Sequence, residues 1–136
     1  MSGPTPEDWT FEACQWRLRE ATRIVIDAEN KYRLCIEEAA DAEALYRKEL
    51  ATAFQTYRTA GKPVEESNTL ARGDVVLHSR NRDYAAGVVK LAADKLEDAR
   101  DSRRSLWRLI EWARERDLIA LRTSGTDERV PAERWP

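Results

Sequence analysis

The sequence contains few of the residues that interrupt helices. Five glycines and five prolines occur among 136 residues, most of them near the two ends or at one central point. A chain with so few turn-forming residues makes few turns, which predicts long helices. Charged residues make up 35% and hydrophobic residues 42% of the chain, which is too apolar and too balanced in charge for a disordered protein. The length suits one domain.

Cysteine is also scarce, and long hydrophobic runs are missing. On one helix, Cys14 and Cys35 would lie about 30 Å apart, too far for a disulfide within the chain, so we expect reduced thiols. No apolar stretch approaches the ~20 residues that a membrane-spanning helix needs. Residues 1–7 lack the basic and apolar segments of a signal peptide. The sequence therefore predicts a cytoplasmic protein that does not enter a membrane.

Motifs for catalysis, cofactors or metals are missing too. The chain has one histidine, His78, and its two cysteines lack metal-ligand spacing. Glycine-rich phosphate loops and the nucleophile elbow of hydrolases do not occur. Residues 37–41 resemble the acidic helix motif of magnesium-binding all-α nucleotide pyrophosphohydrolases, but in the fold predicted below Glu97 lies about 16 Å along the helices from Glu38. We expect a protein that is not an enzyme and binds no cofactor, with a nucleotide hydrolase as the remotest alternative.

Two periodic segments flank a single break at residues 61–63. A helix is predicted over residues 9–60, with either Thr5 or Thr10 as its cap, and a second helix over residues 64–121. Glycine just after a helix adopts the left-handed conformation easily, and proline suits the first turn of the next helix. Residues 1–8 are predicted to be an N-terminal extension. A stop at Thr123-Ser124-Gly125 predicts that residues 122–136 form a flexible C-terminal tail.

Both helices carry an alternating three- and four-residue repeat of apolar positions, which is typical of a coiled-coil seam. When the chain is folded about Lys62, every seam residue of the second helix faces a seam residue of the first. Large residues meet small ones, as in the pairs Tyr32–Ala92 and Ala28–Leu96, so the helices can stay close together. The predicted fold is all-α: a long antiparallel two-helix coiled-coil hairpin that oligomerises into a larger helical bundle. The seam of its second helix is Ala85, Val89, Ala92, Leu96, Ala99, Arg103, Leu106, Ile110 and Ala113.

Several large apolar side chains remain outside the seam. Tryptophan and arginine are the common anchors of protein interfaces. Four tryptophans should gather at the end of the hairpin away from the turn, where either a second copy or a different protein covers them. The candidate interface residues are Trp9, Trp16, Arg103, Arg104, Trp107, Arg108, Trp112, Tyr84, Val88 and Leu91.

The most basic stretch is Arg100–Arg116, in which six arginines outnumber Asp101, Glu111 and Glu115. Arginines beside Trp107 have the chemistry to bind and stack on single-stranded nucleic acid. The net charge of −2 argues against a general nucleic-acid-binding protein. Nucleic acid therefore stays an alternative partner.

The segments Tyr46–Lys48, Ala53-Phe54 and Tyr57–Glu66 resemble small alanine-rich helical-hairpin accessory proteins of tailed bacteriophages and prophages, often encoded among replication and recombination genes. The similarity covers about residues 30–110 and implies no catalytic residues. The leading hypothesis is a protein–protein interaction module that acts, as a phage accessory or host-takeover protein, on DNA replication or recombination machinery. The alternatives are a virion scaffold or connector protein and a single-stranded nucleic-acid-binding accessory protein.

Overall fold

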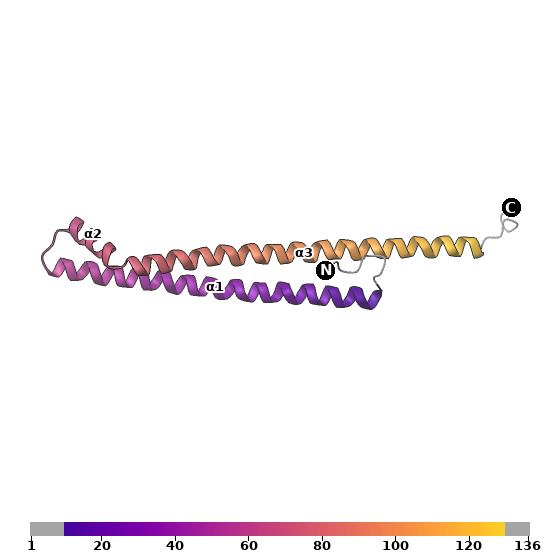
Figure 1. Ribbon diagram of the computed structural model, residues 1–136, viewed down its shortest axis with the longest axis horizontal. Coiled ribbons are helices and arrows are strands. Elements are labelled where there is room, and N and C mark those ends of the chain that lie inside the picture. The colour runs from indigo at the N-terminus through magenta and orange to yellow at the C-terminus, as the bar shows by residue number, and fades with distance from the viewer. Residues whose placement is uncertain (1–9, 130–136) are drawn as a thin grey trace. The chain divides into compact units, whose positions relative to one another are not determined.

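In the computed structural model, residues 10–129 are described, with side chains for residues 10–123. They form three helices, α1 (Phe11–Thr59), α2 (Val64–Asp74) and α3 (Val76–Arg129) (Figure 1). No strand occurs among these residues, so the prediction of an all-α chain is confirmed. None of the described helices is long and apolar enough to cross a membrane.

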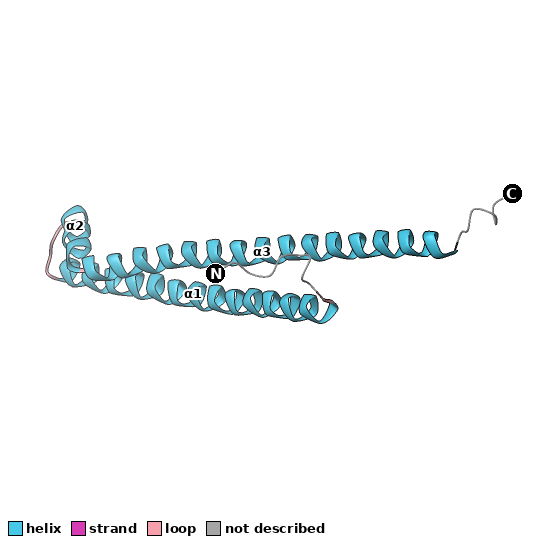
Figure 2. Cartoon of the chain, turned by 45° about the vertical axis from the view of Figure 1, so that its right-hand side comes forward, coloured by secondary structure: helices cyan, strands magenta, loops and turns pink. Residues whose placement is uncertain are grey.

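The second predicted helix, over residues 64–121, is interrupted in the structure. The backbone leaves the helical conformation at Val75, with φ −105° and ψ 21°, and α2 and α3 lie on either side of this residue (Figure 2). Two features of the sequence weaken a helix here: Gly73, and the β-branched pair of Val75 and Val76. The predicted seam of the second helix begins only at Ala85, so the coiled-coil repeat does not extend over residues 64–84.

The start and the end of the helical region also differ from the prediction. Helix α1 begins at Phe11, and the hydroxyl of Thr10 caps it by accepting a hydrogen bond from the backbone N–H of Ala13 at 3.2 Å. Helix α3 continues through the predicted stop at residues 123–125 to Arg129, so residues 122–129 are helical. Glycine inside a helix costs about 1 kcal/mol relative to alanine but does not by itself end the helix.

The turn after α1 has the predicted left-handed glycine. Gly61 has φ 89°, the only positive φ among the described residues. Its N–H donates to the carbonyl of Arg58 at 3.0 Å, and the N–H of Lys62 donates to the carbonyl of Tyr57 at 3.2 Å. These two bonds form a Schellman motif, which satisfies the last carbonyls of α1 and reverses the chain.

The chain divides into two compact units. The first combines α1 up to Val25 with α3 from Ala99 onward. The second contains the rest of α1, all of α2, and α3 up to Asp98.

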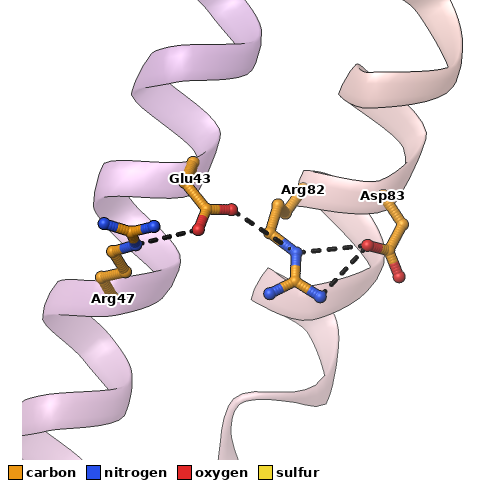
Figure 3. Close-up of polar contacts among 4 residues, drawn as sticks. All are labelled: Glu43, Arg47, Arg82 and Asp83. Carbon is orange, nitrogen blue, oxygen red and sulfur yellow. Dashed lines mark hydrogen bonds and ion pairs between the residues drawn. The ribbon is translucent and has the colours of Figure 1, made fainter.

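In the second unit, α1 and α3 run antiparallel (Figure 1). Arg82 of α3 connects them, because its guanidinium lies 4.1 Å from the ring centre of Tyr46. Its Nε also lies 3.6 Å from Oε2 of Glu43 (Figure 3). Glu43 also accepts a hydrogen bond from Arg47 on its own helix at 2.9 Å. Burial lowers the pKa of Arg82, but its hydrogen bond to Asp83 and its contact with Tyr46 outweigh this effect and raise it. Arg82 therefore stays charged and links the two helices.

Helix α2 packs a face of small residues inward. Ser67 and Ala71 of α2, and Val75 directly after its end, follow one another every four residues and are almost completely buried. The hydroxyl of Ser67 donates to the carbonyl of Lys62 at 3.3 Å, so this buried polar group has a partner. Short side chains allow the α2 backbone to approach the rest of the unit closely.

The predicted seam identifies the less exposed face of α3. All nine of its seam residues are buried or half-buried, and Ala92, Leu96 and Ala113 are among the core residues. On α1, Val25 and Cys35 are buried, whereas Phe11 at the start of the helix is 77% exposed.

Candidate functional site

The first unit contains an apolar groove between α1 and α3 with a volume of about 590 Å³. Residues 11, 14 and 18 share one face of α1, and residues 107, 110, 114, 118 and 121 share one face of α3, because each set follows the three- and four-residue spacing of a helix. Helix α3 continues past the first residue of α1, so nothing on α1 faces its last turns (Figures 1 and 2). The lining residues are Phe11, Cys14, Gln15, Leu18, Trp107, Ile110, Ala113, Arg114, Asp117, Leu118 and Leu121.

A second hollow of about 340 Å³ adjoins this groove, since Leu18 and Trp107 line both. Arg103, Arg104, Arg108 and Glu111 line the rest of it. We call the two hollows together the tryptophan groove. Its floor is apolar, and its rim at one end is rich in arginine.

The charges on the rim of the tryptophan groove are only partly paired within the chain. Arg104 forms an ion pair with Asp101 at 2.7 Å, and Asp117 forms one with Arg116 at 3.2 Å. The other charged lining residues, Arg103, Arg108, Arg114 and Glu111, have no ion pair or hydrogen bond within the described part of the chain. Because three of these unpaired side chains are arginines and one is a glutamate, they give the rim a net charge of +2.

The predicted tryptophan cluster is divided among different surfaces. Trp107 lines both hollows, whereas Trp112, also 49% exposed, lines neither and has the guanidinium of Arg116 at 5.4 Å from its ring centre. Five residues along a helix correspond to a rotation of roughly 140°, so these two tryptophans point away from different faces of α3. Trp16 is 60% exposed and also lines neither hollow, and Trp9 lies outside the described residues.

Four of the ten candidate interface residues, Arg103, Arg104, Trp107 and Arg108, therefore meet at one site. Tyr84, Val88 and Leu91 belong to the second unit, where they form a separate stripe on α3. Tyr84 and Leu91 are exposed and Val88 is half-buried.

Helix α1 carries an exposed stripe in the second unit that was not predicted from the sequence. Leu34, Glu38, Asp41 and Leu45 follow the spacing four, three, four, which places them on one face of the helix, and Glu37 lies beside them. Leu34 is 55% and Leu45 is 46% exposed. The side chains of Glu37, Glu38 and Asp41 have no ion pair or hydrogen bond with any described residue. We call these five residues the acidic stripe.

The acidic stripe also bears on the hydrolase alternative. Residues 37–41 were compared above with a magnesium-binding motif. In the part of the chain that the structure describes, no group of three or more His, Cys, Asp or Glu side chains is arranged to hold a metal ion. Glu37, Glu38 and Asp41 lie on an open helix face that also carries the exposed Leu34 and Leu45.

No protein-family model, curated protein sequence or solved structure matches this chain.

Proposed function

We propose that this chain is a non-catalytic protein–protein interaction module, built as a long antiparallel two-helix coiled-coil hairpin that oligomerises into a larger helical bundle. The observation that carries the proposal is the tryptophan groove, in which a half-exposed Trp107 lies on an apolar floor beside Arg103 and Arg108, which form no ion pair with any described residue. Interfaces take most of their binding energy from a few tryptophan, tyrosine and arginine anchors. An apolar groove along helices suits an amphipathic helix of another protein.

The proposed role is that of a phage-type accessory or host-takeover protein acting on DNA replication or recombination machinery in the cytoplasm. Its support is the resemblance around the turn, which includes Gly61 and the residues on either side of it. A virion scaffold or connector is the alternative favoured by the exposed apolar residues in both units, such as Leu34, Leu91 and Leu121.

Binding of single-stranded nucleic acid is a further alternative. Arg103, Arg108 and Arg114 lack ion pairs among the described residues and lie near Trp107, which offers a ring for base stacking. Its signature would be an affinity that falls steeply as salt rises, because each phosphate contact releases a counterion.

The test is an affinity capture from bacterial lysate, with and without nuclease, using the wild-type chain and the variants Trp107→Ala and Trp112→Ala. The two tryptophans are both 49% exposed on α3, but only Trp107 lines the groove, so Trp112→Ala is a matched control. We expect one stoichiometric, nuclease-resistant protein that binds the wild type and Trp112→Ala and is lost with Trp107→Ala, at unchanged helicity. Retention of nothing, or only of material that nuclease removes, would contradict the proposal.

A further inference from the structure

We infer that the occupant of the tryptophan groove is a second copy of this chain, which binds there through its acidic stripe. The inference rests on the proposed function in one respect, namely that the groove binds protein. It goes further because both contacting surfaces are on this molecule: the groove in the first unit and the stripe in the second.

The apolar groups of the two surfaces have the same spacing. Leu34 and Leu45 of the stripe are eleven residues apart, and so are Trp107 and Leu118 of the groove. Eleven residues of helix correspond to about 16 Å and to three full turns, so each pair projects from one side of its helix. Two such helices laid side by side place both leucines of the stripe on apolar groups of the groove at once.

The charges between these apolar groups are complementary. The stripe presents Glu37, Glu38 and Asp41, and the groove presents Arg108 and Arg114. None of these five side chains has an ion pair or hydrogen bond with a described residue of its own chain, so association does not break an existing pair. Glu111 is the one unpaired acid in the groove, and the neighbouring arginines outnumber it.

A monomer would leave the apolar side chains of both the tryptophan groove and the acidic stripe exposed to water, which is unfavourable. Phe11 and Leu121, at one end of the groove, are 77% and 68% exposed in the isolated chain. Contiguous exposed apolar surface bordered by charges usually marks an interaction site. Each copy has one groove and one stripe, so two copies can exchange two identical contacts in a closed dimer, or many copies can associate head to tail. A foreign helix would compete with the stripe for the groove.

The test uses charge reversal and sedimentation equilibrium on the full chain. The groove variant carries Arg108→Glu and Arg114→Glu, and the stripe variant carries Glu38→Arg and Asp41→Arg. The wild type should associate at about 100 µM protein in about 50 mM salt, where charges are weakly screened. Each variant alone should associate at least about tenfold more weakly. An equimolar mixture of the two should associate as the wild type does, because each reversed surface then meets its complement.

The control variant carries Glu65→Arg and Asp94→Arg, two exposed acids of the second unit outside the acidic stripe, and should associate like the wild type. Circular dichroism checks that every variant keeps its helicity. A monomeric wild type, or reversed variants that associate like the wild type or are not restored by mixing, would overturn the inference. The proposed function would survive that result if Trp107→Ala still lost a foreign partner and Trp112→Ala kept it.

Discussion

The hydroxyl of Tyr57 on α1 donates a hydrogen bond to a carboxylate oxygen of Asp74 at the end of α2, with 2.6 Å between the two oxygens. The two residues are 17 positions apart, so the bond ties the last turn of α1 to the point where α2 ends. It holds together the two elements on either side of Gly61, and Asp74 directly precedes the break at Val75.

This bond predicts a pH dependence at the alkaline end. The hydrogen bond to Asp74 is the main cause that raises the pKa of Tyr57 above its ordinary value of 10.0, with burial and the negative charge of Asp74 adding to it. Because the folded pKa is higher than the unfolded one, the stabilising contribution is complete below about pH 10 and is lost as pH rises through the folded value.

The measurement is an absorbance titration of the phenolate, comparing the wild type with Tyr57→Phe to isolate this one tyrosine. Asp74→Asn should bring the pKa of Tyr57 back toward its ordinary value, because the negative acceptor is gone. A Tyr57 that titrates identically with and without the Asp74 carboxylate would contradict the bond.

Replacing each of two glycines by alanine should change the free energy of unfolding in opposite directions. Gly61→Ala places a side chain at φ 89° and should destabilise the chain by about 1 kcal/mol. Gly87→Ala lies inside α3, where an added Cβ meets nothing within 4 Å, and should stabilise the chain by about 0.5–1 kcal/mol through helix propensity. Thermal unfolding followed by circular dichroism measures both. Equal shifts of the same sign would refute the Schellman turn at Gly61.

The packing of α2 is tested by enlarging its buried face. Ser67 is completely buried, so Ser67→Leu should overpack the contact and destabilise the chain by about 1–3 kcal/mol. The neighbouring Asn68 is exposed, and Asn68→Leu should change the free energy of unfolding by less than about 0.5 kcal/mol. Urea unfolding compares the two variants. If Ser67→Leu were tolerated as well as Asn68→Leu, α2 would not pack as described.

The candidate site was predictable only in part. The arginine and tryptophan content of Arg100–Arg116 indicated an interface, and four of its predicted residues line the tryptophan groove. Sequence alone did not separate Trp107 from Trp112, because the face of a helix that a partner helix covers depends on packing. The acidic stripe was not predicted, because it is defined by the exposure of Leu34 and Leu45, and exposure follows from the packing of the helices.

Three features of the described residues could be predicted from the sequence: their all-helical structure, the chain reversal at Gly61, and the residues that form the less exposed face of α3. These features follow from local rules: few helix breakers, the left-handed preference of glycine, and the three- and four-residue period of a buried helix face. The break at Val75, the continuation of α3 to Arg129 and the groove around Trp107 became known only from the structure. The groove depends on which residues of α1 and α3 lie opposite each other, whereas the two helix ends depend on small differences between weak local preferences of single residues.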